Sequence, residues 1–245
     1  MENKLGGTKV GLDEQVLAII PARGGSKRLP GKNMLELGGE PLIGHTIKAA
    51  RSCTCVTDIY VSTDCPVIQE YALSQKVQAP KLRPNELAGD HISMSEVLIG
   101  LLSGFEILPE TIVILQPTSP LRSSMDIDNA YSLYKGKRAK NVVSVSEVSH
   151  PIQWSGKIGS DLSMNAFLDI NVANYRSQDL DKYFQLNGAI YIANTKEFLS
   201  HKQLLFNDES SFAYIMPKTR SVDIDDYIDF QLAKVLYENL EKGIQ

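Results

Sequence analysis

The sequence has little of what marks exported, membrane or nucleic-acid-binding proteins. Its 245 residues include only three cysteines and four histidines. No apolar run approaches the roughly 20 residues that cross a bilayer, and residues 1–15 are polar and lack the apolar core of a signal peptide. The formal net charge of −4 lacks the basic excess of nucleic-acid binders. We therefore expect a cytoplasmic protein with neither a membrane nor a nucleic acid as partner.

The few cysteines are Cys53, Cys55 and Cys65. An odd number in a chain of this length is typical of a reduced protein rather than of a disulfide framework. Cys53 and Cys55 are two residues apart, and no histidine nearby completes a zinc pattern. This spacing favours structural or incidental thiols. The four histidines are scattered, so we do not expect them to bind a metal.

Apolar strand-like runs alternate with helical periodicity, which predicts an α/β protein with a largely parallel sheet. We expect a polar N-terminal tail over 1–15 and one domain over 16–245. Thr63 and Asp64 are expected to cap a helix over 66–75. Residues 150–186 have weak helical periodicity and are expected to form an irregular insertion that carries a partner contact or a substrate lid. We expect strands at 16–20, 58–62, 111–115, 141–148, 188–193 and 212–216, and helices at 41–51, 66–75, 95–105, 124–136 and 225–242.

The most informative segment follows the first apolar run and reads PARGGSKRLPGKN over residues 21–33. Glycines let a backbone approach an oxyanion closely, and the four cations of this loop neutralise charge that amides alone do not hold. In open α/β sheets, such loops at strand ends bind ligands. The segment lacks the spacing of a Walker A loop and of the GxGxxG fingerprint. It predicts a polyphosphate cradle, with a solvated basic turn as the alternative.

A second pattern is acidic and lies near the C-terminus. Asp223 and Asp225 are two residues apart, so on an extended segment their side chains point to one face. Such a pair suits a hard divalent cation such as Mg²⁺. Because Asp226 and Asp229 continue the run, a helix N-cap is an equal alternative on the residues alone.

The 21–33 loop resembles the signature of the acylneuraminate cytidylyltransferases, which use CTP to activate sialic acids and related nonulosonic acids. The resemblance extends over about residues 16–240 and implies a Rossmann-like nucleotidyltransferase fold (glycosyltransferase-A-like), a three-layer αβα arrangement with a mostly parallel sheet. Further matches are IYVSTD at 59–64, LRP at 82–84, ELA at 86–88, LQPTSPLR at 115–122, NGAIY at 187–191 and VDID at 222–225.

The resemblance implies a CTP site in which Arg23, Lys27 and Lys32 stabilise charge on the phosphates. Of the loop's cations, Arg28 is the one least expected to touch substrate. Arg83 is expected to contact the nucleotide, with a surface ion pair as the alternative. The implied nucleotide-binding residues are Pro21, Ala22, Arg23, Gly25, Ser26, Lys27, Lys32, Asn33, Arg83, Asp90 and Ser93.

The resemblance also implies a sugar site beside the nucleotide. Gln153 and Gln185–Leu186 stand where some members have lysine and arginine, which leaves the exact sugar open. For Tyr191, core packing is the alternative. The implied sugar-binding residues are Gln116, Thr118, Ser119, Gln153, Gln185, Asn187, Gly188 and Tyr191.

In the family the residues that match Asp223 and Asp225 bind the catalytic Mg²⁺, for which Mn²⁺ is a substitute. The implied reaction is attack of the sugar's anomeric hydroxyl on the α-phosphorus of CTP, which gives CMP-sugar and pyrophosphate. Asp225 is the expected acceptor of the hydroxyl proton. The 150–186 insertion resembles the family's dimerisation region, so we expect a homodimer. A CMP-KDO synthetase and a non-catalytic CTP-binding relative stay open as alternatives.

Overall fold

The computed structural model describes residues 15–89, 91–165, 167–168 and 175–243. Strand β1 (Val16–Pro21) is buried on both faces, which its uninterrupted apolar sequence permits. Ala18 and Ile20 join one hydrophobic core cluster, whereas Leu17 and Ile19 join a second cluster on the other face of the sheet. This two-sided burial shows that the sheet containing β1 is the central layer of the fold.

Six strands form the main sheet in the order β4-β1-β5-β7-β6-β8. Neighbouring strands pair in parallel except where β7 is involved, because β7 is antiparallel to both β5 and β6. The largely parallel sheet predicted from the sequence is thus confirmed. The strands of the main sheet are β1, β4 (Asp58–Ser62), β5 (Thr111–Ile114), β6 (Asn141–Glu147), β7 (Phe184–Asn194) and β8 (Ser211–Ile215). A separate hairpin pairs β2 (Glu36–Leu37) with β3 (Glu40–Pro41).

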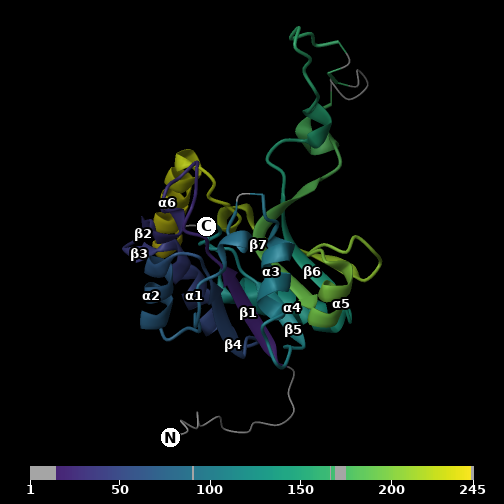
Figure 1. Ribbon diagram of the computed structural model, residues 1–245. Coiled ribbons are helices and arrows are strands. Elements are labelled where there is room, and N and C mark those ends of the chain that lie inside the picture. The colour runs from purple at the N-terminus through teal and green to yellow at the C-terminus, as the bar shows by residue number, and fades with distance from the viewer. Residues whose placement is uncertain (1–14, 90, 166, 169–174, 244–245) are drawn as a thin grey trace, which may run out of the picture.

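Helices cover both faces of the sheet and give the three-layer αβα arrangement (Figure 1). One face carries α1 (Leu42–Ser52), α2 (Pro66–Ser74) and α4 (Ser124–Gly136), and the other carries α3 (Met94–Leu102) and α5 (Thr195–His201). Helix α6 (Tyr227–Glu241) packs on the β2–β3 hairpin through a third cluster. In the part of the chain that the structure describes, no helix has the length and apolar character that a membrane crossing requires.

One local expectation needs correction, and one helix was not predicted. The N-cap of α2 is Cys65, not Thr63 or Asp64, and no side chain caps this end in the described structure. Asp64 instead accepts a hydrogen bond from the Gly24 amide through Oδ1 at 2.8 Å, so it fixes the loop after β1. Helix α5, which the sequence analysis missed, is short and begins at an Asn194 N-cap.

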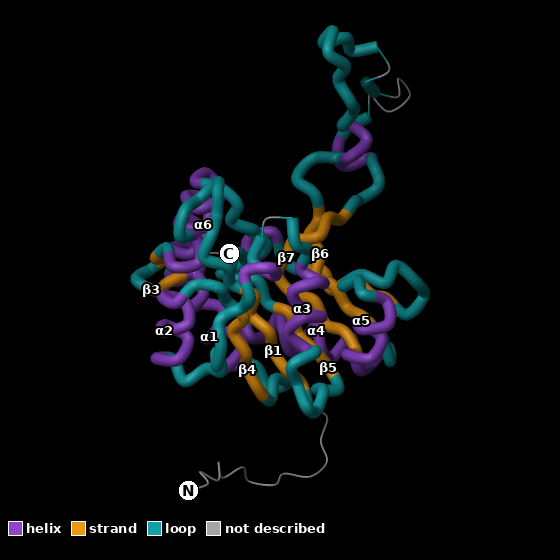
Figure 2. The backbone as a smooth tube through the Cα atoms, viewed as in Figure 1, coloured by secondary structure: helices purple, strands orange, loops and turns teal. Residues whose placement is uncertain are grey.

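The described residues of the segment 148–183 leave the sheet between β6 and β7 and extend away from the body of the protein (Figure 2). This segment, which we call the arm, contains only two short 3-10 helices among its described residues, Ile152–Trp154 and Ser177–Asp179. The predicted insertion over 150–186 corresponds to the arm, except that residues 184–186 belong to β7. Its role as a partner contact or lid stays a prediction.

Candidate active site

A pocket of about 290 Å³ lies at the carboxyl ends of β1 and β5, the edge at which open α/β sheets bind ligands. Four segments line it: the loop after β1, the stretch that leads into α3, the loop after β5, and the segment before α6. Cations and carboxylates therefore face the same space. The charged lining residues are Arg23, Lys32, Arg83, Asp223 and Asp225.

The loop after β1 is folded by its own polar groups. The Asn33 side chain donates to the Arg23 carbonyl at 2.9 Å, which joins the two ends of the loop. Oδ1 of Asn33 is buried without a hydrogen-bond partner among the described residues and is thus an acceptor available to a ligand. The structure places five of the eight predicted loop residues on the pocket wall: Pro21, Arg23, Ser26, Lys32 and Asn33. Ala22, Gly25 and Lys27 belong to the same loop but do not line the pocket.

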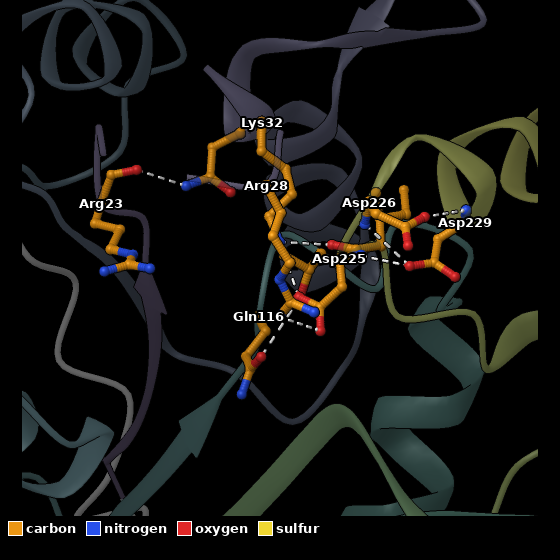
Figure 3. Close-up of polar contacts among 10 residues, drawn as sticks. Arg23, Arg28, Lys32, Gln116, Asp225, Asp226 and Asp229 are labelled. Carbon is orange, nitrogen blue, oxygen red and sulfur yellow. Dashed lines mark hydrogen bonds and ion pairs between the residues drawn. The ribbon is translucent and has the colours of Figure 1, made fainter. Parts of the chain in front are cut away.

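Lys32 and Arg28 both contact Asp225 (Figure 3). Lys32 Nζ donates to Oδ1 of Asp225 at 3.1 Å and to the Ile224 carbonyl at 2.7 Å. Arg28 Nη2 bonds the other carboxylate oxygen, Oδ2, at 2.8 Å. These pairs could not be predicted from the sequence, because about two hundred residues separate their members. Arg28 thus lies against one of the two expected metal ligands.

The helix-cap alternative for the acidic run applies to Asp226 and Asp229. Asp226 is the N-cap of α6 and accepts from the amides of Ile228 and Asp229, and the Asp229 carboxylate bonds back to the Asp226 amide (Figure 3). This capping box satisfies the first turn of the helix. Asp223 and Asp225 lie outside it and line the pocket together, as their spacing predicted.

The two pocket carboxylates differ in their surroundings. Burial raises the pKa of Asp223, and the neighbouring charge of Asp225 adds to the rise. Burial also opposes ionisation of Asp225, but its hydrogen bond with Lys32 and the charges of Lys32 and Arg28 outweigh burial and lower its pKa. Oδ1 of Asp223 is buried with no hydrogen-bond partner in the described structure. Oδ1 of Asp223 therefore has no partner, whereas each oxygen of Asp225 already bonds one cation.

A bulge in β7 brings the NGA sequence against Asp223. Val143 of β6 pairs with Tyr191, but Val145 pairs with Leu186, so one β6 residue opposes four residues of β7. Ser144 fills this gap: its hydroxyl donates to Asn187 Oδ1 at 2.6 Å and accepts from the Ile190 amide at 2.8 Å. The bulge turns the chain at residue 188.

Gly188 is required at this turn for two reasons. Its φ of +71° is in the left-handed region, and an added Cβ would lie 3.0 Å from Asp223 Oδ2 and 3.5 Å from Gln116 Oε1. The Asn187 side chain also bonds Ser221 Oγ at 3.0 Å, so its amide holds the bulge. Contact of Asn187 or Gly188 with a sugar stays a prediction.

A second pocket, of about 450 Å³, shares Asp223 with the first. Gln185 and Asn187 line it, together with residues near the start of α6. Asp223 therefore forms part of the boundary between two hollows, one rich in cations and one beside the β7 bulge. Two ligands that react with each other need this kind of arrangement.

The other predicted sugar residues divide by location. Gln116 and Thr118 line the first pocket, and buried Ser119 donates to the Asn187 carbonyl at 3.4 Å. Gln153 lies in the arm, where it donates to the Asp181 carbonyl at 3.4 Å, and it lines neither pocket. Tyr191 packs against a core cluster and lines neither pocket, and burial raises its pKa.

The remaining nucleotide candidates also differ. Arg83 lines the pocket and is held by Ser62, to whose carbonyl and hydroxyl oxygens it donates at 2.6 and 3.2 Å. Burial lowers the pKa of Arg83. Ser93 is the N-cap of α3 in a capping box with Glu96, and Asp90 lies outside the described residues.

The sequence analysis assigned no role to Arg122, although it lies within a matched motif. Its side chain is buried and donates to the carbonyls of Gln116 and Ala189 at 3.2 and 2.8 Å, and to Thr46 Oγ1 at 2.8 Å. Burial lowers its pKa to about 10. Arg122 thus joins the loop after β5 to the β7 bulge, the two segments that meet at Asp223.

The backbone matches solved structures of nucleotidyltransferases. The structure titled CMP:2-keto-3-deoxy-manno-octonic acid synthetase complexed with CTP aligns with a TM-score of 0.67 over 92% of this chain and 99% of that one, at 18% identity. The 4-diphosphocytidyl-2C-methyl-D-erythritol synthase of Anaerococcus prevotii aligns with a TM-score of 0.63 over 92% and 96%, at 13% identity. At these identities the likeness shows the fold, which is Rossmann-like.

The sequence defines the family more narrowly. The cytidylyltransferase family profile matches residues 17–242, and this chain belongs to that family. It is 37% identical to the CMP-N,N'-diacetyllegionaminic acid synthase of Legionella pneumophila over 91% of this chain and 97% of that protein. The pseudaminic acid cytidylyltransferase of Campylobacter jejuni is 32% identical over 91% and 96%. These matches confirm the resemblance drawn from the motifs.

A further relative is longer than this chain. The N-acylneuraminate cytidylyltransferase of Streptococcus agalactiae is 40% identical over 87% of this chain, and the match spans about half of that protein (51%).

Proposed function

We propose that the protein transfers the cytidylyl group of CTP to the anomeric hydroxyl of a nonulosonic acid, with release of pyrophosphate. One observation carries this proposal: the cationic loop after β1 and the Asp223–Asp225 pair face one pocket, and Asp223 also borders a second. The relatives' names indicate nine-carbon sugar acids of the legionaminic, neuraminic and pseudaminic types.

The lining of the first pocket suits a nucleoside triphosphate. Arg23, Ser26 and Lys32 supply the donors that a triphosphate requires. The wall that leads into α3 is mostly apolar and is formed by Leu87, Ala88, Gly89, Ile92, Met94 and Val97. We propose that the cytosine lies against this wall while the phosphates point toward the loop after β1.

A divalent cation fits the carboxylate pair. Asp223 and Asp225 provide oxygen ligands on one wall, and the buried Oδ1 of Asp223 has no partner among the described residues. Mg²⁺ typically takes one or two carboxylates plus phosphate oxygens. We propose that these two residues hold Mg²⁺, or Mn²⁺ in its place. When bound, such an ion neutralises phosphate charge and lowers the pKa of a coordinated hydroxyl.

The residues of the chain itself then have distinct roles. Lys32 holds charge near the α-phosphorus and keeps Asp225 ionised through their 3.1 Å contact. Both oxygens of Asp225 bond cations, whereas Oδ1 of Asp223 is unoccupied and Asp223 borders both pockets. We therefore propose Asp223, through the carboxylate oxygen that does not hold the ion, as the proton acceptor in place of Asp225, and Asp225 as the second ion ligand and the charged partner of Lys32.

We further propose that the enzyme is a cytoplasmic homodimer in which the arm supplies part of the interface. The arm carries several apolar side chains that are exposed to solvent in the single chain, which is typical of an interaction surface. The exposed apolar residues of the described arm are Ile152, Ile158, Leu162, Met164, Tyr175 and Tyr183. Leu162→Asp should shift the mass measured by analytical ultracentrifugation from dimer toward monomer; a wild-type mass that is already monomeric would contradict the dimer.

The substrate class is tested by pyrophosphate release. Purified protein is incubated with CTP and Mg²⁺ and with N-acetylneuraminic, legionaminic or pseudaminic acid, or with KDO. Turnover of at least one nine-carbon acid, at a higher kcat/KM than KDO, is expected. Turnover of KDO alone would assign the chain to the CMP-KDO branch, and no turnover would favour a CTP-binding protein without activity.

A further inference from the structure

Two of the three cysteines lie together with a carboxylate, away from the candidate active site. Cys53 follows α1, Cys55 lies in the loop that enters β4, and Asp128 is in the second turn of α4. This loop enters β4 at its amino end, which is the edge of the sheet opposite the nucleotide pocket. One ligand atom from each residue lies within 4.8 Å of the other two. Cys53 is buried, and Cys55 and Asp128 are half-buried.

The spacing of the sulfurs matches a shared metal ligand sphere. The two Sγ atoms are 4.0 Å apart, and both cysteines are free thiols. Two thiolates at about 2.3 Å from a tetrahedral zinc ion are about 3.8 Å apart. A disulfide would need about 2.05 Å. The observed separation is therefore close to that of two zinc ligands and about twice that of a bonded pair.

Asp128 holds the loop in this conformation before any ion is bound. Its Oδ1 accepts from the Thr54 amide at 2.8 Å, from the Thr54 hydroxyl at 3.0 Å and from the Cys55 amide at 3.1 Å. Among the described residues these three hydrogen bonds all use Oδ1, which leaves Oδ2 to face an ion. Polar partners that orient ligands in this way increase metal affinity.

We propose that Cys53, Cys55 and Asp128 bind a thiophilic divalent ion such as Zn²⁺, with water as the fourth ligand. The ion would join the α1–β4 loop to α4 and so clamp two elements that flank the first core cluster. The sequence analysis favoured incidental thiols because no histidine is nearby; the missing ligand is a carboxylate 73 residues from Cys55.

The first test uses the unaltered chain, reduced and freed of metal. Zn²⁺ is added before a pulse of N-ethylmaleimide, and the alkylated peptides are measured by mass spectrometry. Cys53 and Cys55 should be protected at one Zn²⁺ per chain, whereas alkylation of Cys65 should proceed at an unchanged rate. Equal protection of all three thiols, or of none, would overturn the site.

The second test uses Co²⁺ as a spectroscopic probe. Wild type and Cys65→Ser should both show a thiolate-to-cobalt charge-transfer band, and Cys55→Ser should lose about half of it. Asp128→Asn, which keeps the hydrogen-bonding Oδ1, should keep the band but bind about tenfold more weakly. A wild-type spectrum in Cys55→Ser would place the ion elsewhere and refute the proposal, even if Cys53 variants fail to fold.

Discussion

Replacement of Gly188 by alanine has two effects at the β7 bulge: it strains the backbone, and it places a new Cβ against Asp223. The backbone at residue 188 has a φ of +71°, so any L side chain there incurs about 1–2 kcal/mol of strain. The new Cβ would also lie 3.0 Å from Asp223 Oδ2, so that carboxylate must move by a few tenths of an ångström. Since a shift of about 1 Å in a reacting group costs roughly a hundredfold in rate, we expect Gly188→Ala to lower kcat about tenfold.

Gly39→Ala is the matched control. Gly39 in the β2–β3 hairpin has a φ of +80°, yet an added Cβ meets no atom within 4 Å. Both variants should lose about 1–2 kcal/mol of unfolding free energy in urea, and a chain of this size loses about 2–4 °C in Tm per kcal/mol. Only Gly188→Ala should lose activity in the pyrophosphate-release assay.

The comparison refutes the reasoning in either of two outcomes. If Gly188→Ala keeps the wild-type kcat, the position of Asp223 does not limit the reaction. If Gly39→Ala loses as much activity as Gly188→Ala, the loss follows from backbone strain and not from the contact with Asp223.

Three further predictions concern charged groups. Asp225→Asn should lower kcat about a hundredfold while CTP binding by calorimetry stays within about twofold; Asp226→Asn, an equally good helix N-cap, is the control and should stay near wild type. Arg28→Ala frees an oxygen of Asp225, and since exposed pairs contribute about 0.2–1 kcal/mol, the half-saturating Mg²⁺ concentration should fall up to about fivefold; a rise would contradict the competition. Asp126→Asn breaks the ion pair between the buried Asp126 and the half-buried Arg220 and should cost about 3 kcal/mol at pH 7 by urea unfolding. Hydrogen bonds from Arg220 and Ser123 outweigh the effect of burial and lower the pKa of Asp126. The pair therefore stabilises the fold fully at a pH above the ordinary carboxyl pKa of 3.8, and this stabilisation is lost as the pH falls through the lower pKa of the folded state. The difference in unfolding free energy between Asp126→Asn and wild type should therefore narrow in acid, and a difference that stays constant with pH would contradict this reasoning.

The fold was largely predictable because its strands are uninterrupted apolar runs. Residues 16–20 and 111–115 are continuous apolar runs that favour burial on both faces, and the structure places both in interior strands of the sheet. The antiparallel direction of β7 was not predictable, because nothing in its apolar run sets its direction relative to β5. Local composition also misplaced the start of this strand by four residues, since the predicted strand begins at 188 and β7 begins at Phe184.

The candidate site was predictable where its residues are adjacent in sequence. The 21–33 loop was recognisable from its own residues, whereas the spacing of Asp223 and Asp225 left a helix N-cap as an equal alternative until the family resemblance favoured a metal pair. The contacts of Arg28 and Lys32 with Asp225 span 197 and 193 residues, so only the folded chain shows them. The same holds for Arg122, whose burial against the β7 bulge depends on a strand about seventy residues later.

The central claim is nucleotidyl transfer at the α-phosphorus of CTP, and the position of a radioactive label tests it most directly. With a nine-carbon sugar acid and Mg²⁺, label from [α-³²P]CTP should appear in the sugar nucleotide, and label from [γ-³²P]CTP should appear in pyrophosphate. Label from the γ-position in a sugar phosphate, or in inorganic phosphate with no sugar nucleotide formed, would contradict the account.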